Sequence, residues 1–278
     1  MANLFVPPGH FYSPIPDANE VAAHLARLGP AIFRAIPGID LDDALITKTW
    51  DDLLPLMRQA PFQDEANASH RYHWQNAFYS YGDAAFYYAL IADRRPARII
   101  EIGSGFSSAL ALDTRDLLHL ETQLTFIEPY PDILQTLLRP GDGEQTRLIR
   151  DRVQNVDTAL FAELDTNDIL FIDSSHVLKT GSDVCFELFE ILPSLKPGVI
   201  VHFHDVFYPF EYPQAWVLHQ NRAWNELYAL RAFLMYNRAF KIFFFNDYFR
   251  QRFPDRVASS QTVFGRNPGG GLWLTAAG

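Results

Sequence analysis

The stretch Arg98-Ile-Ile-Glu101-Ile-Gly103-Ser104-Gly105-Phe106-Ser107-Ser108 decides the fold of this chain. Its first five residues are typical of a short buried strand. The glycines indicate a tight turn, and the residues from Phe106 onward are typical of the start of a helix. About 25 residues later, a second apolar run ends in Glu128. A glycine turn after one strand and a carboxylate at the tip of the next indicate a pocket for a cofactor that carries a ribose, whose hydroxyls the carboxylate binds.

The composition narrows the class of protein. The chain has 278 residues, of which 48% are hydrophobic, and a net charge of −10. An acidic protein without a basic patch repels phosphate backbones, so we expect no nucleic acid partner. The single Cys185 excludes an internal disulfide and a zinc site built from cysteines. We find no signal peptide and no long apolar run, and we therefore expect a cytoplasmic protein without a membrane partner.

The spacing of the apolar residues changes at residue 97. Short β-branched runs then alternate with helical patterns, which predicts an α/β fold: a Rossmann-like, mostly parallel seven-stranded sheet with helices on both faces. We expect residues 1–85 to form an N-terminal helical and extended cap, and residues 86–278 to form the main domain. A helix is expected to open at Asp83, and another to span residues 221–238. The strands are expected at residues 98–102, 124–127, 147–149, 169–172, 198–203, 241–245 and 271–275.

Polar residues follow directly after the apolar runs that we read as strands. In an open α/β sheet, ligands bind beyond the carboxyl ends of the strands, where these residues would meet. The glycine turn lacks the third glycine of a dinucleotide fingerprint, so it favours a ligand without a diphosphate and argues against a nicotinamide dehydrogenase. The residues concerned are Glu101 to Gly105, Glu128, Asp173, and His204 with Asp205.

Four segments in this order resemble successive motifs of the class I S-adenosylmethionine-dependent methyltransferases. They are Glu101-Ile-Gly-Ser-Gly-Phe-Ser, Ile127-Glu128-Pro-Tyr-Pro, Asp168-Ile-Leu-Phe-Ile-Asp173 and Leu195-Lys-Pro-Gly-Val-Ile-Val-His-Phe-His-Asp205. Asp173-Ser-Ser-His176 together with the last segment is similar to the methyltransferase-24 group. The resemblance covers roughly residues 80–245. It implies S-adenosylmethionine as cofactor and methyl transfer to a hydroxyl of a small molecule, such as a sugar or a natural product.

The resemblance also implies a set of cofactor contacts. The methionine half of the cofactor would lie against Glu101, Gly103, Ser104 and Gly105. Glu128 would hold the ribose, Tyr130 would pack near the adenine, and Asp151 or Arg152 would lie at the adenine edge. Ser80 and Asp83 would reach the amino-acid end of the cofactor; helix capping by Asp83 is the alternative.

Asp173, His176, His204 and Asp205 form the expected catalytic cluster. Metal-assisted relatives hold a divalent cation at these two strand ends, which here would place Mg, Mn or Zn on Asp173, His204 and Asp205. Such an ion lowers the pKa of a hydroxyl. In one common version of the motif, an amide residue follows the second aspartate. Here that position is occupied by Val206. Without a metal, a histidine is the natural base.

Aromatic residues and prolines follow Asp205, and we expect a lid over the acceptor at about residues 206–238. The same residues also suit the surface of a homodimer. Two other functions stay open at this point. One is a relative that binds S-adenosylmethionine but performs another chemistry, such as a hydroxylase-like reaction. The other is a binding module without catalysis.

Overall fold

The structure, a computed structural model, describes residues 4–28 and 35–277. Its centre is a seven-stranded sheet in the order β3-β2-β1-β4-β5-β7-β6. The first five strands in this order run parallel, and β7 runs antiparallel to both β5 and β6. The predicted α/β class and Rossmann-like sheet are therefore confirmed. The strands are β1 (Arg98–Ile102), β2 (Gln123–Ile127), β3 (Thr146–Ile149), β4 (Ile169–Ile172), β5 (Ile200–Phe203), β6 (Phe240–Phe245) and β7 (Leu272–Ala276).

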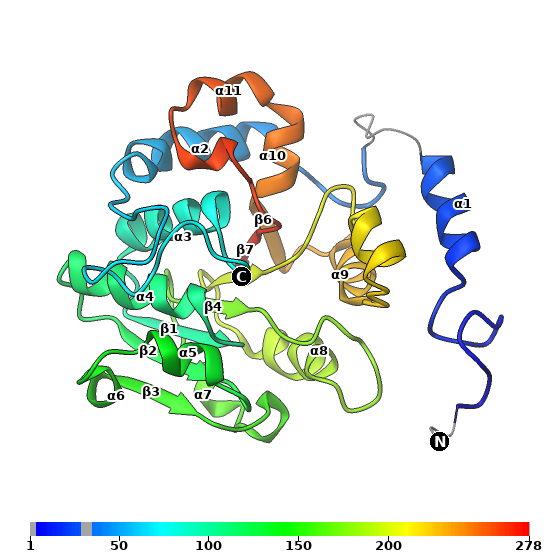
Figure 1. The fold of residues 1–278 in the computed structure, drawn as a ribbon, viewed down its shortest axis with the longest axis horizontal. Coiled ribbons are helices and arrows are strands. Elements are labelled where there is room, and N and C mark those ends of the chain that lie inside the picture. The colour runs from blue at the N-terminus through cyan, green and yellow to red at the C-terminus, as the bar shows by residue number, and fades with distance from the viewer. Residues whose placement is uncertain (1–3, 29–34, 278) are drawn as a thin grey trace.

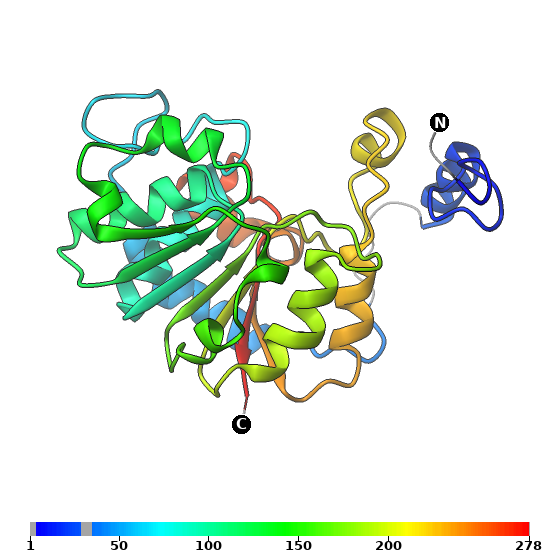
Figure 2. The ribbon, with the colours of Figure 1, turned by 90° about the horizontal axis from the view of Figure 1, so that it is seen from below.

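Helices cover both faces of this sheet. Helices α2, α3 and α4 lie on one face, and α8 and α9 lie on the other (Figures 1 and 2). The longer helices are α1 (Ala18–Leu28), α2 (Asp43–Met57), α3 (Tyr81–Arg94), α4 (Phe106–Leu117) and α9 (Glu226–Leu234). The shorter ones are α5 (Asp132–Leu137), α6 (Asp142–Gln145), α7 (Ala159–Ala162), α8 (Asp183–Phe186), α10 (Asn246–Arg252) and α11 (Pro254–Ser259). No helix in the described ranges is long and apolar enough to cross a bilayer.

Strands β4 and β5 lie inside the sheet, and their burial explains their continuous apolar sequences. All four residues of β4 and all four of β5 are buried, because helices cover the sheet on both sides. In the register of the sheet, Ile102 of β1 pairs with Ile172 of β4. The backbone N–H of Asp173 then donates to the carbonyl of Ile102 at 2.8 Å. The ends of β1 and β4 are thus held level with each other.

The N-terminal part does not form a separate cap as far as residue 85. Trp50 of α2 stacks on Phe249 of α10, with ring centroids 4.3 Å apart, and it is buried. Residues 43–57 therefore share the core of the main domain. A boundary after residue 85 would also cut α3, which begins at Tyr81. By contrast, no described residue of α1 is buried, and its His24 reaches Glu211 at 3.1 Å.

Two predicted helices begin elsewhere than expected. Ser80, not Asp83, precedes the first residue of α3, and Asp83 is buried within the first turn of the helix. The predicted helix at 221–238 shrinks to α9, because residues 221–225 belong to a loop whose end is tied to the carbonyl of His176. That loop brings the start of α9 to the polar residues after β4.

Candidate active site

The turn between β1 and α4 lies directly against the end of β4. Gly103 has a φ of +86°, and a Cβ at this position would lie 2.0 Å from the carbonyl oxygen of Asp173. Only glycine combines this conformation with such a close approach. The surroundings of Gly105 are more open, since a Cβ at this position would contact only Ile133, at 3.6 Å. The space beside Gly105 is thus available to a ligand.

Glu101 is buried behind this turn and supports the start of α4. Its Oε1 accepts hydrogen bonds from the hydroxyls of Ser107 at 2.5 Å and Ser108 at 3.0 Å. Its Oε2 has no partner among the described residues, and the same holds for the buried hydroxyl of Ser104. Burial raises the pKa of Glu101 to about 8, although the two serine hydroxyls oppose the shift. At neutral pH this side chain is therefore largely a neutral acid that orients the turn.

A cavity of about 420 Å³ opens at the carboxyl ends of β1, β2 and β4. Five residues expected at the cofactor or in the catalytic cluster line it: Gly103, Glu128, Tyr130, Arg152 and Asp173. Glu128 Oε1 accepts a hydrogen bond from the backbone N–H of Tyr130 at 2.8 Å, which leaves its other oxygen for a ligand. The Tyr130 side chain is 73% exposed, so its ring is accessible to a planar group.

Six residues expected at the cofactor lie outside this lining: Glu101, Ser104 and Gly105 at the glycine turn, and Asp151, Ser80 and Asp83. Asp151 accepts hydrogen bonds from the backbone of Arg152 and the amide of Asn155, both at 2.7 Å, and so stabilises its own turn. Ser80 accepts from the amide of Asn267 at 3.4 Å. Asp83 belongs to the histidine network described below.

His176 stands between the carboxylates at the ends of β4 and β5. Its Nε2 lies 3.4 Å from Asp173 Oδ1 and 3.6 Å from Asp205 Oδ2. Its Nδ1 lies 2.8 Å from Glu226 Oε2, at the first turn of α9. Since both ring nitrogens face carboxylate oxygens, the geometry favours a ring that donates at both positions. Of the two aspartates, Asp173 is 35% exposed and Asp205 17%, whereas the histidine is buried.

His204 is the second histidine of this cluster. Its Nε2 lies 3.4 Å from Asp205 Oδ1, and its Nδ1 lies 4.0 Å from Asp83 Oδ2. Asp83 also accepts from the backbone of Gly270 at 3.1 Å and from the amide of Asn246 at 2.9 Å. Burial raises the pKa of Asp83 to about 7, although the nearby His204 opposes the shift. The helix-capping alternative for Asp83 is therefore wrong: it joins α3 to the cluster.

The surrounding carboxylates favour the charged form of both histidines. Burial lowers the pKa of His176, but Asp173 and Glu226 outweigh it, and the pKa rises well above the ordinary value. Burial likewise opposes the charged form of His204, yet Asp205, Asp173 and Asp83 raise its pKa. The pKa of Asp173 is lowered, because the two histidines outweigh its burial. Burial lowers the pKa of His202, inside β5, and its ring packs against Phe171 with ring centroids 4.2 Å apart, as expected for a core histidine.

Sequence reasoning missed Glu226, Glu187 and Asn246. Glu226 and Glu187 are both buried beside the cluster, and Glu187 accepts a hydrogen bond from Ser174 at 3.2 Å. Neither lies in a recognisable motif. The run of glycines at 269–271 is the feature of the sequence that could have indicated a close contact near Asp83 and Asn246. A Cβ on Gly269 would collide with the Asp83 carboxylate.

The residues expected to hold a divalent metal do not fit that role. Asp173 Oδ1 and Asp205 Oδ2 both lie near Nε2 of His176, at 3.4 and 3.6 Å. A bound cation would need such oxygens at about 2.0–2.6 Å from one point. Among the described residues, no group of three or more His, Cys, Asp or Glu side chains could hold a metal ion.

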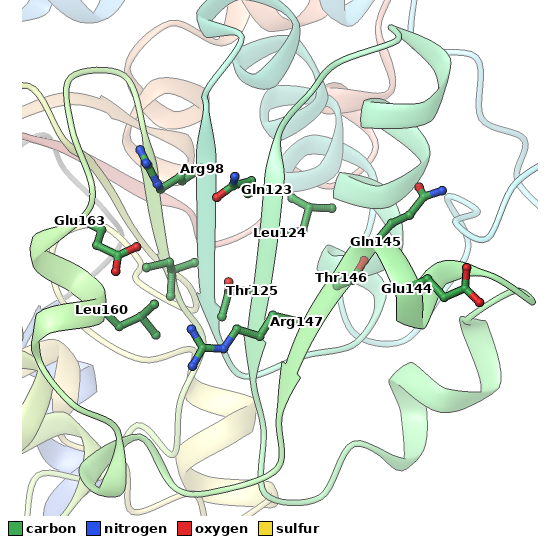
Figure 3. Close-up of a pocket in the computed structure, with 11 residues that line it drawn as sticks. Arg98, Gln123, Leu124, Thr125, Glu144, Gln145, Thr146, Arg147, Leu160 and Glu163 are labelled. Carbon is green, nitrogen blue, oxygen red and sulfur yellow. The ribbon is translucent and has the colours of Figure 1, made fainter.

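A second cavity, of about 360 Å³, lies elsewhere on the sheet (Figure 3). Its lining includes Arg98, Gln123 and Thr146, which are the first residues of β1, β2 and β3. Leu160 and Glu163, in and after α7, line it as well. The cavity therefore lies toward the amino ends of the strands, away from the edge at which α/β sheets bind ligands.

Two sequence comparisons find relatives of this chain. Residues 100–206, which include the carboxyl ends of β1, β2, β4 and β5, match the model of methyltransferase family 24, described as a methyltransferase domain. An uncharacterized protein of Archaeoglobus fulgidus is 37% identical over 177 residues, which cover 59% of this chain and 75% of that protein. The chain belongs to the class I methyltransferases.

Solved structures of other methyltransferases have a similar fold. A methyltransferase of Podospora anserina, bound to S-adenosylhomocysteine, aligns with 96% of this methyltransferase and 99% of its own chain, at 16% identity and a TM-score of 0.46. The O-methyltransferase TomG of Streptomyces achromogenes, in complex with S-adenosylmethionine, aligns over 93% and 96%, at 15% identity and a TM-score of 0.44.

Proposed function

We propose that this methyltransferase transfers the methyl group of S-adenosylmethionine to a hydroxyl of a small molecule. The observation that carries the proposal is the lining of the 420 Å³ cavity, which contains both Glu128 and Asp173 of the expected catalytic cluster. In this cavity Glu128 would hold the ribose of the cofactor, and the cofactor would supply the methyl group.

The walls of the cavity suit such a cofactor. The free oxygen of Glu128 is placed to accept hydrogen bonds from the ribose hydroxyls, and Tyr130 offers a ring for the adenine. Gly103 and the open space beside Gly105 allow the methionine half to approach the backbone. Glu101 acts indirectly, since it holds the turn rather than lining the cavity.

We assign the base to Asp205. The surrounding carboxylates raise the pKa of both histidines and so favour their protonated forms, whereas Asp205 is a partly exposed side chain at the tip of β5. In the reaction, the hydroxyl oxygen attacks the methyl carbon, the new O–C bond forms as the C–S bond breaks, and its electron pair goes to sulfur. The hydroxyl proton goes to Asp205. His204, 3.4 Å away, stabilises that carboxylate and orients it.

The backbone at the cluster supports a specialised role. Asp205 has a φ of +57° and His176 a φ of +59°, both in the left-handed region that non-glycine residues rarely adopt. Such strain gathers where function requires a fixed side-chain position. Both residues belong to one cluster of charged side chains, which makes the pair more informative than either alone.

The acceptor and the base can be tested together. A panel of sugars, phenols and polyketide-like alcohols is incubated with S-adenosylmethionine, and products are examined by mass spectrometry for the gain of one methyl group. We expect Asp205→Asn to bind S-adenosylhomocysteine as the unaltered protein does, but to lose at least about 100-fold in turnover. Retained turnover in this variant would exclude Asp205 as the base.

A further inference from the structure

We propose that a cavity between α1 and residues 211–228 binds a small aromatic carboxylate, and that Arg222 holds the carboxylate group. This α1 cavity has a volume of about 470 Å³. It shares no lining residue with the cavity that we assign to the cofactor. The inference concerns the α1 cavity alone and does not depend on the proposed methyl transfer.

Arg222 is held in place by two indole rings. Its guanidinium carbon lies 4.2 Å from the ring centroid of Trp216 and 4.5 Å from that of Trp224. The two rings stand at 81° to each other with centroids 5.7 Å apart, so they form a corner around the guanidinium. The backbone N–H of Arg222 also donates to the carbonyl of Trp216 at 3.0 Å. Stacking on aromatic faces fixes a guanidinium without using its N–H donors.

The donors of this guanidinium are unused within the described part of the chain. In residues 4–28 and 35–277, the Arg222 side chain has no hydrogen-bond or ion-pair partner. By contrast, the exposed Arg256 and Arg266 each pair with a carboxylate. A guanidinium offers five donors in a rigid fork that matches a carboxylate. A partly buried fork that is positioned but unpaired therefore points to an anionic group of a ligand.

The walls of the α1 cavity suit an aromatic body. Val21 and Leu25 of α1 contribute aliphatic side chains, and Tyr212, Trp224 and Tyr228 contribute rings. The rings of Tyr212 and Trp224 stand at 72° to each other, with centroids 5.9 Å apart. Small-molecule sites typically combine such apolar walls with a few polar groups that orient the ligand.

The other charged groups of the α1 cavity leave room for an anion. Arg27 and His24 line it, as do the carboxylates of Glu20 and Glu211. Glu211 is already bonded, because its Oε1 lies 3.1 Å from Nε2 of His24 and its Oε2 accepts from the hydroxyl of Tyr228 at 3.0 Å. The guanidinium between the indole rings is thus free to pair with a carboxylate that enters from outside.

The α1 cavity borders the expected catalytic cluster through one residue. Trp224 lines the cavity, and its ring packs against that of His176 with centroids 4.3 Å apart. A ligand bound here is either the methyl acceptor itself or a separate molecule beside the acceptor. Both sources share the chemistry of an aromatic carboxylate, and the experiment distinguishes them.

The test measures the preference for a carboxylate by calorimetric titration. The probes are naphthoate with its neutral analogue naphthalenemethanol, and para-hydroxybenzoate with para-hydroxybenzyl alcohol. We expect the unaltered chain to bind the acids at least about tenfold more tightly than the alcohols, and Arg222→Gln to lose this preference. Arg222→Lys keeps the charge but not the fork, so its preference should be intermediate. Arg238→Gln, at an exposed position outside the α1 cavity, is the control and should bind as the unaltered chain does.

Two results would overturn the proposal. One is a folded, unaltered chain that binds neither acid, or that binds the acids no more tightly than the alcohols. The other is an Arg222→Gln variant that keeps the full preference. If thermal unfolding shows that Arg222→Gln does not fold, a full preference in Arg222→Lys takes its place as the contrary result.

A second step identifies the source of the ligand. para-Hydroxybenzoate is incubated with S-adenosylmethionine and examined by mass spectrometry for the gain of one methyl group. A gain that Arg222→Gln reduces makes the α1 cavity part of the acceptor site, whereas binding without methylation makes it a separate ligand site. Both results support a carboxylate site at Arg222. Titration with S-adenosylhomocysteine reports independently on the proposed function, because the two cavities have no residue in common.

Discussion

At the scale of single residues, Glu101 makes the stability of the protein depend on pH. Its pKa of about 8 lies above the ordinary value of 4.5, so the folded state keeps a proton that the unfolded chain loses between these values. Stability therefore falls as the pH rises through this window, by at most about 1.4 kcal/mol per pH unit. Asp83, with a pKa of about 7, adds a contribution of the same sign.

We expect Glu101→Gln to flatten this dependence, because the amide still accepts from both serines but does not titrate. Urea denaturation of the ligand-free protein at several values between about pH 5 and pH 8 measures the effect. Glu65→Gln, on an exposed loop, is the control and should follow the unaltered protein. Equal slopes for all three proteins would show that Glu101 is ionised when folded.

The proposed position of the cofactor depends on a second single residue, Glu128. Glu128→Ala removes the acceptor from the wall of the cavity, and we expect S-adenosylhomocysteine to bind about 1–3 kcal/mol more weakly. Calorimetry measures the change, with Glu121→Ala, an exposed residue outside that cavity, as control. Unchanged affinity in a folded Glu128→Ala would place the ribose elsewhere.

At the scale of elements, the junction of β1, α4 and β4 depends on Gly103. Its φ is positive, and the Cβ of an alanine there would lie 2.0 Å from the carbonyl oxygen of Asp173, which leaves no room for that side chain. We expect Gly103→Ala to lower the free energy of unfolding by about 2–4 kcal/mol. Gly143→Ala is the matched control, because nothing lies within 4 Å of its Cβ, and it should change stability by less than about 1 kcal/mol. Similar values for both variants in chemical denaturation would contradict the close approach.

The elements also show what the sequence predicts and why. Strands buried on both faces produce apolar runs that are visible in the sequence, so the seven predicted strands agree with the structure to within a few residues. Contacts between distant segments leave no such pattern. Glu226 contacts His176, which is 50 residues away in the sequence. Asn246 donates a hydrogen bond to Asp83, which is 163 residues away. Asp83 was expected at the cofactor, but the packing of the glycine turn at 269–271 brings it to His204 instead.

At the scale of the whole molecule, one buried ion cluster joins the segment before α3 to the sheet domain. Arg71 bonds Asp113 of α4 at 2.7 Å and Asp142 of α6 at 2.5 Å, and all three side chains are buried. Removing the cation would leave two buried carboxylates without their partner. We expect Arg71→Met to cost about 3–5 kcal/mol of stability.

The control for this variant is Arg256→Met, whose ion pair with Asp51 is exposed on both sides. It should cost at most about 1 kcal/mol. Thermal and urea unfolding of both variants compare the two pairs. Equal losses would mean that the Arg71 cluster does not hold the N-terminal segment to the domain.

The central claim is that the cavity at the ends of β1, β2 and β4 binds the nucleoside cofactor of a methyltransferase. Calorimetric titration with S-adenosylhomocysteine, with NAD as control, tests it most directly. The account predicts binding of S-adenosylhomocysteine in the micromolar range with one site per chain, and no binding of NAD. Absence of S-adenosylhomocysteine binding to the folded protein, or equal binding of NAD, would contradict it.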